Sequence, residues 1–155
     1  TSGLCVCAKN AHSANLLQKS IEKTYFAVVC GALKGNGTID APIARETDSI
    51  ILRTVREDGQ RAITHHKSLK YNTKYSLLKV KLETGRTHQI RIHMKSIGHA
   101  LLGDGLYGSE LPDWYGMERV ALHSSHMEII HPITGKKLSF DADLPKDMAG
   151  TLSKY

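Results

Sequence analysis

Five side chains able to form hydrogen bonds occupy six consecutive positions near the middle of the chain, directly after Gly85. They are Arg86, Thr87, His88, Gln89 and Arg91. Guanidinium groups, and backbone amides at the start of a helix, bind the oxygens of phosphates and carboxylates. This stretch therefore favours a site for an anion, although two arginines near a helix start are more often simply solvated.

A helix is expected directly after these residues. The apolar residues at the spacing of one helical face are Ile90, Met94 and Ile97. Thr87 can cap the amino-terminal end, which would leave Arg86 beside unpaired backbone amides. Gly98 is placed to end the helix in a left-handed conformation. Arg91 lies on a different face from the apolar residues, so it need not be buried in the core.

The composition predicts one domain over residues 1–155. Of the 155 residues, 41% are hydrophobic, and no apolar run approaches the roughly 20 residues that span a bilayer. The net charge of +6 slightly favours a polyanionic partner such as nucleic acid. The first residues lack the pattern of a secretory signal and the three cysteines form no CxxC, so we expect a cytoplasmic protein. Because the chain begins with Thr1 rather than Met, we also expect a fragment of a longer protein.

Most of the chain has the pattern of strands. The expected strands are residues 4–8, 23–31, 39–43, 50–55, 61–67, 75–83, 119–130 and 137–142. The strand 4–8 would bury Cys5 and Cys7 on one face, and Asp58-Gly59 would join 50–55 to 61–67 as a hairpin. A first helix over 11–22 would be capped by Asn10, and residues from Pro145 onward would form a tail. The prediction is an α+β fold with a mixed, mostly antiparallel sheet and helices packed on it.

The central stretch also carries a resemblance to a known family. GRTHQIRIH followed by GHALLGDGLYG is similar to the third signature motif of the RluA-type pseudouridine synthases, which isomerise uridine in RNA. KTYFAVVCG resembles the K-x-Y-x-A-x-V-x-G strand of that family, and Arg119, Leu122 and His123 match its R-x-x-L-H element. Thr1-Ser2-Gly3 resembles the end of the family's second motif, so the resemblance covers nearly the whole chain.

The resemblance implies a catalytic domain that begins just after its nucleophile. In the family the second motif is H-R-L-D-x-x-T-S-G, and its Asp would lie three residues before Thr1. The implied reaction breaks the C1′–N1 bond of a uridine in ribosomal or transfer RNA, rotates the base and joins C1′ to C5. It needs no cofactor. The chain alone is expected to be inactive, and a lone His123-x-x-His126 pair gives no reason to expect a metal.

The resemblance also assigns roles to individual residues. Arg91 is expected to pair with the catalytic Asp, and Tyr25 to stack on uracil and assist a proton transfer; the alternatives are a surface charge and a strand tyrosine of the core. Arg86 and His88 would hold loop backbone or RNA phosphate. Asp104 and Tyr107 would be scaffold for the glycine-rich loop, and Arg45 belongs to a segment where the family has an arm near the RNA.

Two other functions remain open at this point. One is an RNA-binding or chaperone module without catalysis on the same scaffold, suggested by the missing Asp. The other is an unrelated phosphate-binding enzyme that uses Arg86 at the helix start, which leaves the other motif matches unexplained. RNA is the expected partner and no membrane is expected, whereas the sequence is uninformative about the oligomeric state.

Overall fold

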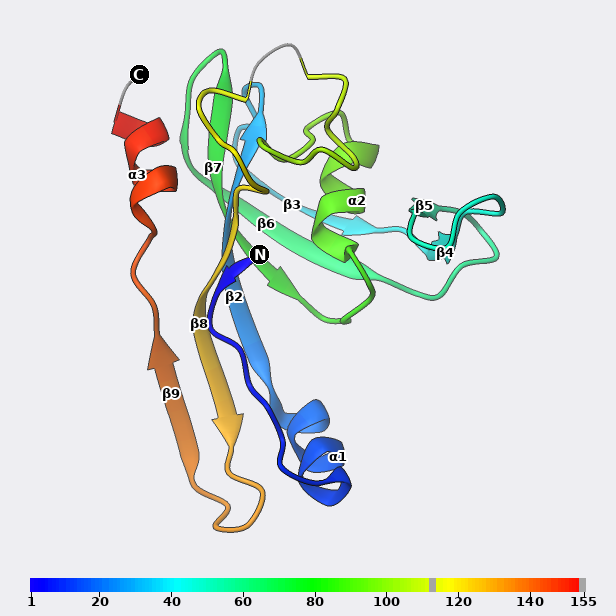
Figure 1. Cartoon of the computed structure of the whole chain (residues 1–155), viewed down its shortest axis with the longest axis vertical. Helices are drawn as coiled ribbons and strands as arrows, with labels where there is room; N and C mark the ends of the chain where they lie inside the picture. The colour runs from blue at the N-terminus through cyan, green and yellow to red at the C-terminus, as the bar shows by residue number, and fades with distance from the viewer. Residues whose placement is uncertain (112–113, 154–155) are drawn as a thin grey trace.

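The chain is organised around one seven-stranded sheet. The computed structural model describes residues 1–111 and 114–153, and Figure 1 shows their arrangement. The strands are β1 (Ser2–Gly3), β2 (Glu22–Cys30), β3 (Asn36–Asp40), β6 (Ile63–Tyr71), β7 (Tyr75–Leu82), β8 (Leu122–Ile130) and β9 (Lys137–Asp141). Their order is β1-β8-β2-β7-β6-β3, and β9 also pairs with β8. The β1–β8 pair is parallel and the others are antiparallel, which confirms the predicted mixed, mostly antiparallel sheet.

Both faces of the sheet bury apolar side chains, because β2 and β7 each direct apolar residues to both faces. Ala27 and Leu78 are register partners on one face, where they pack against α2 (Gln89–Ser96). Val28 and Leu77 are partners on the opposite face, in a cluster that includes Met148 of α3 (Lys146–Ser153). The predicted tail after Pro145 is therefore wrong: it forms a helix that shields this second face.

The first helix has the predicted cap. In α1 (Ala11–Ser20), the side chain of Asn10 accepts a hydrogen bond from the amide of Ser13 at 2.8 Å. Leu17 of this helix packs on Met127 and Ile129 of β8. None of the helices in the described part of the chain is long and apolar enough to cross a membrane.

Residues 4–8 are not a strand. Leu4 and Val6 lie partly buried against the cluster of Leu17, Met127 and Ile129, whereas Cys5 and Cys7 are exposed. The alternation of period two is present, but the prediction assigned the cysteines to the wrong face. The larger aliphatic side chains take the buried positions because they remove more apolar surface from water.

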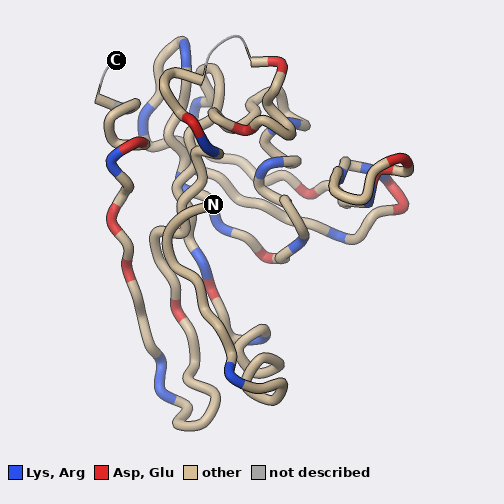
Figure 2. Tube along the Cα trace, in the orientation of Figure 1, with Lys and Arg blue, Asp and Glu red and all other residues tan. Residues whose placement is uncertain are grey.

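The predicted hairpin of residues 50–55 with 61–67 is also wrong. β5 (Arg53–Val55) pairs instead with β4 (Ile43–Arg45), and the two form a separate sheet. β6 has no free edge for β5, because it lies between β7 and β3. Residues 43–55, which we call the arm, project to one side of the main sheet in Figure 1. The arm carries Arg45 and Arg53 together with Glu46 and Asp48, so its formal charge is balanced (Figure 2).

The start of α2 differs from the prediction. The residue at the cap position is His88 in a left-handed conformation with φ 58°, and no side chain caps this end, so Thr87 does not have the expected role. Instead the side chain of Gln89 reaches back, and its Oε1 accepts from the amide of Arg86 at 3.0 Å and from the hydroxyl of Thr84 at 2.8 Å. Gly98 has φ 80° just after the helix, as predicted.

A buried polar network joins α2 to the sheet. Gln89 Nε2 donates to the carbonyl of Ile63 at 2.9 Å and to Thr64 Oγ1 at 3.1 Å. Thr64 Oγ1 contacts His93 Nδ1 at 2.8 Å, and His93 Nε2 contacts the carbonyl of Ala41 at 2.9 Å. A carbonyl only accepts, so Nε2 carries the proton and Nδ1 accepts from the threonine. The network fixes His93 in its neutral form.

This network predicts a loss of stability in mild acid. Burial lowers the pKa of His93, against smaller opposing effects of the Ala41 carbonyl and of Asp40. Below about pH 6.5 the unfolded chain therefore gains a proton that the folded protein binds only at lower pH, and the free energy of unfolding falls. In urea titrations between about pH 7.5 and 5.5, we expect a smaller fall for His93→Gln than for the wild type. Equal falls would show that His93 does not contribute. Burial also lowers the pKa values of His66 and His88, so some decline remains in the variant.

Candidate active site

The four residues predicted as site residues line one cavity of 490 Å³. Tyr25 comes from β2, Arg86 and His88 from the turn after β7, and Arg91 from the first turn of α2. Thr1 also lines this cavity, and the amino terminus lies close to α2 in Figure 1. The structure thus brings Tyr25, Arg91 and the first residues of the chain together on one face of the sheet, while the roles of these residues stay predictions.

Arg91 is held by a buried carboxylate that the sequence analysis treated only as scaffold. Its Nε donates to Asp104 Oδ2 at 2.7 Å and its Nη2 to Asp104 Oδ1 at 2.6 Å, a two-point pair that we call the clamp. The Asp104 side chain is 0% exposed and that of Arg91 is 15% exposed. Among the described residues, Nη1 of Arg91 has no hydrogen-bond partner, so one edge of the guanidinium is available to an anion.

Asp104 is kept ionised although it is buried. Burial by itself raises the pKa of this carboxyl, but hydrogen bonds from Arg91 and from the amides of Tyr107 and Leu106 outweigh it, so the pKa lies below its ordinary value. Both amides donate to Oδ1, at 3.0 Å and 3.1 Å. Four N–H groups therefore converge on the two oxygens of this carboxylate, which is the condition for a stable buried charge.

The glycine before Asp104 is needed for this arrangement. Gly103 has φ 67°, and a Cβ at this position would collide with the carbonyl oxygen of Arg119. The backbone of the Gly103-Asp104-Gly105 loop therefore lies against the segment that leads into β8. The glycines that marked this stretch in the sequence are the signal from which the importance of Asp104 could have been inferred.

Tyr25 faces the same side of the sheet as the clamp. It pairs in register with Val80 of β7 and Ser124 of β8, and it packs against the cluster that contains Ile90. Burial raises the pKa of Tyr25, so its phenol is protonated at neutral pH. A half-buried ring on the floor of an open cavity can stack on a planar base.

The described side chains that line the cavity are basic or uncharged. They include Lys23, Arg86 and Arg91, and no Asp or Glu is among them. Cations close to a carboxylate favour its ionised form, so this lining would stabilise an ionised carboxylate in the cavity.

Arg86 contacts loop backbone, which is one of the two roles predicted for it, and contact with RNA phosphate stays a prediction. Its Nε donates to the carbonyl of Arg61 at 3.0 Å, which holds the loop that precedes β6. Arg86 also lines a second cavity of 450 Å³ between the arm and the turn, together with Arg45 and Arg53. Asp58 on its rim is paired with Arg56. Arg45 and Arg86 beside one neutralised carboxylate make this cavity suitable for phosphate.

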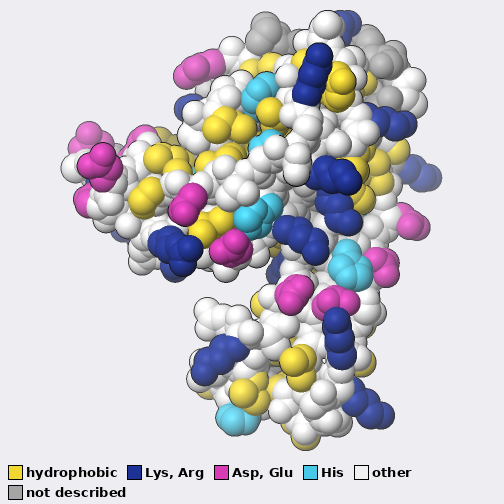
Figure 3. All heavy atoms as spheres, turned by 180° about the vertical axis from the view of Figure 1, so that it is seen from behind, with side chains coloured by type: hydrophobic (Ala, Val, Ile, Leu, Met, Phe, Trp, Pro, Cys, Tyr) yellow, Lys and Arg dark blue, Asp and Glu magenta, His cyan; other side chains and the backbone are white. Residues whose placement is uncertain are grey.

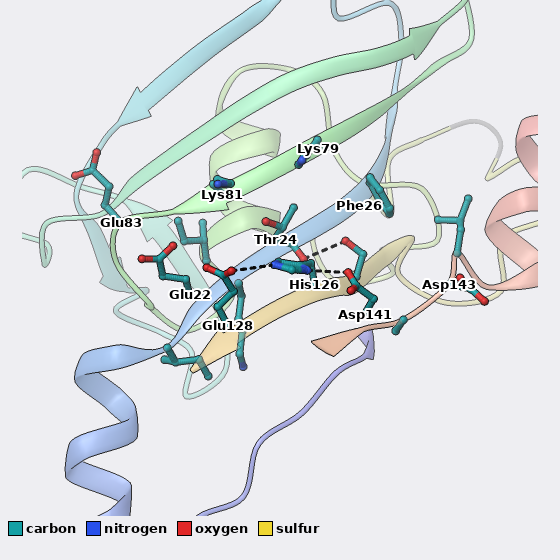
Figure 4. Close-up of a pocket in the computed structure, with 16 residues that line it drawn as sticks. Glu22, Thr24, Phe26, Lys79, Lys81, Glu83, His126, Glu128, Asp141 and Asp143 are labelled. Atoms are coloured by element: carbon teal, nitrogen blue, oxygen red, sulfur yellow. Dashed lines mark hydrogen bonds and ion pairs between the residues drawn. The ribbon is translucent and has the colours of Figure 1, made fainter. Parts of the chain in front are cut away.

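The opposite face of the sheet holds a larger cavity of 780 Å³ with a different character. In Figure 4, His126 of β8 lies between Asp141 and Glu128, and Lys79 and Lys81 project from β7, which is separated from β8 by β2. Figure 3, which views the molecule from behind, shows basic, acidic and histidine side chains intermingled on that side. The carboxylates lining this cavity outnumber its lysines, so it is less suited to a polyanion than the cavity around Arg91. In the described part of the chain, no three His, Cys, Asp or Glu side chains are grouped to hold a metal ion.

Comparison with known proteins identifies the family of the chain and agrees with its fold. The sequence model of the RNA pseudouridylate synthase family matches residues 1–96. The chain is 44% identical over 155 residues to the uncharacterized RNA pseudouridine synthase YjbO of Bacillus subtilis, covering 96% of this chain and 54% of that protein. It is 42% identical over 161 residues to the ribosomal large subunit pseudouridine synthase D of Zymomonas mobilis, covering 96% of this chain and 51% of that protein.

A solved structure gives the same result for the fold. The human RNA pseudouridylate synthase domain containing 1 superimposes with a TM-score of 0.75 at 23% identity, over 88% of this chain and 62% of that one. The match to the family model extends over more than half of the residues, and the chain belongs to the RNA pseudouridylate synthase family. It spans about half the length of the curated relatives that it matches.

The clamp predicts a large effect of a small substitution. Asp104→Asn removes the charge and one acceptor oxygen and leaves the guanidinium of Arg91 without a full partner, so we expect the free energy of unfolding to fall by about 3 kcal/mol. Asp147→Asn is the matched control, because its pair with Arg119 is 2.7 Å long but more than a third exposed on both sides. The control should cost less than about 1 kcal/mol in the same urea titration. Equal losses would contradict a dominant role for the clamp.

Proposed function

We propose that this chain is the greater part of the catalytic domain of an RNA pseudouridine synthase, and that the complete protein isomerises uridine to pseudouridine in RNA. The observation that carries the proposal is the cavity in which Tyr25, the free edge of Arg91 and Thr1 meet. Membership of the family supports this reaction, and the cavity is where we propose that it takes place.

The reaction needs a carboxylate, and none of the described residues places one in this cavity. We propose that it comes from the residue three positions before Thr1, as the resemblance implies, and that it accepts hydrogen bonds from Nη1 of Arg91. A guanidinium within hydrogen-bonding distance of a carboxylate keeps it ionised, and only the ionised form is a nucleophile. The clamp contributes by orienting the guanidinium before the substrate binds, so that no reorganisation is needed during the reaction.

Tyr25 and the arginines would handle the substrate. The target uridine must leave the RNA stack to reach the cavity, and Tyr25 can stack on the extruded base. In the isomerisation the C1′–N1 bond breaks, the uracil rotates, C1′ joins C5, the hydrogen of C5 is lost as a proton, and N1 gains a proton. Arg86 and Arg45 lie at the neighbouring cavity, where they can bind the phosphates that flank the target.

Ribosomal RNA is the substrate class that we favour. Several of the similar proteins, from Zymomonas mobilis, Nitrosomonas europaea and Vibrio cholerae, are ribosomal large subunit pseudouridine synthases D by name. At 37–42% identity this supports a ribosomal target for the present chain, and transfer RNA remains the second candidate.

A non-catalytic RNA-binding module is the second candidate function. The observation in its favour is that the described residues lining the cavity include no carboxylate. It predicts that the complete protein binds RNA with an affinity that falls as salt rises, yet converts no uridine. The coding sequence immediately upstream of Thr1 separates the two functions, because only the enzyme requires an Asp there.

The enzyme proposal is tested with RNA that carries tritium at C5 of uridine. Because C5 loses its hydrogen, the complete wild-type protein should release tritium into water, and no release from ribosomal or transfer RNA would refute the proposal. Arg91→Lys keeps the charge but loses the two-point geometry with Asp104, so we expect kcat to fall by about 100-fold or more. Arg56→Lys, at an exposed pair outside the cavity around Arg91, should leave kcat within about twofold.

A further inference from the structure

We propose that Tyr107 is a positioning residue that couples the arm to the guanidinium of Arg91, so that engagement of RNA at the arm and the geometry of the clamp are linked. This inference rests on the proposed function, because it gives the arm and the clamp parts in one reaction. Tyr107 follows Asp104 in the glycine-rich loop, and its amide, its ring and its hydroxyl each make a different contact.

The backbone and the ring of Tyr107 act on the clamp. Its amide donates to Asp104 Oδ1 at 3.0 Å, which orients the carboxylate. Its ring lies beneath the guanidinium, with 4.9 Å between the ring centroid and Cζ of Arg91. A cation over an aromatic face is attracted by the ring quadrupole. Asp104 therefore binds one edge of the guanidinium, and the ring of Tyr107 covers one of its faces. Nη1 bonds neither of them.

The hydroxyl of Tyr107 acts on the arm and on His88. Tyr107 Oη accepts a hydrogen bond from the amide of Arg53 in β5 at 3.0 Å. It also lies 3.0 Å from Nδ1 of His88. Burial raises the pKa of Tyr107, so the phenol keeps its proton and can donate it to that nitrogen. His88 is then neutral, with its remaining proton on Nε2.

The conformation of His88 is a second sign that this contact matters. His88 is one of the few described non-glycine residues with a positive φ, at 58°, a backbone conformation that is uncommon for residues other than glycine. The imidazole meets the Tyr107 ring edge-on, with 5.5 Å between centroids and an angle of 75°. The hydroxyl bond and the ring contact hold His88 in place at the start of α2, one turn before Arg91.

The arm contacts α2 and Tyr107 through one apolar cluster, and a movement of the arm can be transmitted through it. Ile43 and Leu52 of the arm pack in one cluster with Ile92 of α2 and Tyr107 itself. The guanidinium of Arg53 is occupied within the arm, since its Nη1 donates to the carbonyl oxygens of Ile50, Ile51 and Leu52. The backbone amide of Arg53 is therefore the polar link between the arm and the clamp, and the hydroxyl of Tyr107 accepts its hydrogen bond.

Tyr107→Phe and Tyr107→Leu separate the roles of the hydroxyl and the ring. Phe keeps the ring beneath Arg91 and loses only the hydroxyl, whereas Leu loses both. Tyr75→Phe is the matched control: it also loses a buried tyrosine hydroxyl, which donates to the carbonyl of Thr151 at 3.0 Å in a different cluster. Each variant is made in the complete protein.

The first readout is amide hydrogen exchange, which needs no substrate. We expect Tyr107→Phe to speed exchange at the amide of Arg53 about tenfold relative to the amide of Leu78 in the core sheet, and Tyr75→Phe to leave this ratio unchanged. The Leu78 reference removes any general loss of stability. An unchanged ratio in Tyr107→Phe overturns the proposal.

The second readout is the kinetics of tritium release. Tyr107→Phe should raise KM for RNA severalfold with kcat within about threefold, because the arm is loosened while the clamp keeps its ring. Tyr107→Leu should also lower kcat, to about one tenth of the kcat of Tyr107→Phe. A tyrosine with only a structural role would not separate the effects on KM and kcat in this way. If the two variants show no such separation, the coupling is overturned. If the wild type releases no tritium, the proposed function fails and the kinetic link to the clamp fails with it, while the exchange ratio still decides whether Tyr107 anchors the arm.

Discussion

The buried ion pair between Asp104 and Arg91 is the interaction on which the rest of the site depends. A carboxylate without exposure to water is tolerated only when its oxygens are fully hydrogen-bonded, and here two guanidinium N–H groups and two backbone amides supply those bonds. This requirement dictates the tight Gly103-Asp104-Gly105 loop and fixes which edge of the guanidinium remains free. The cationic edge in the cavity is therefore a consequence of how Asp104 is buried.

The remaining structure positions the two partners of this pair. The sheet supplies a rigid floor, since β2 and β7 bury side chains on both faces. Gln89 and His93 lock α2 onto β6 through a network in which every donor has an acceptor, so Arg91 leaves the helix at a defined angle. Polar networks of this kind are stable only when complete, and they then specify one arrangement.

Local patterns in the sequence were reliable where local physics decides the structure. The strands predicted at 23–31 and 75–83, the Asn10 cap and Gly98 follow from side chains a few residues apart, and these predictions are confirmed. The pairing of β5 with β4 depends on which strand edges are already occupied, which no local pattern contains. The resemblance named Tyr25, Arg86, His88 and Arg91, which line one cavity, while their roles stay predictions. It did not reveal Asp104 as the partner of Arg91, because that contact depends on the path of a glycine-rich loop.

We propose that Arg91, held by Asp104, presents its free Nη1 edge to a carboxylate that precedes Thr1. A crystal structure of the complete protein tests it most directly. We expect a carboxylate oxygen from upstream of Thr1 about 3 Å from Nη1, with Nε and Nη2 still bonded to Asp104. A structure in which the upstream carboxylates all lie more than about 6 Å from Arg91, beyond the range at which a cation controls their ionisation, would contradict the claim.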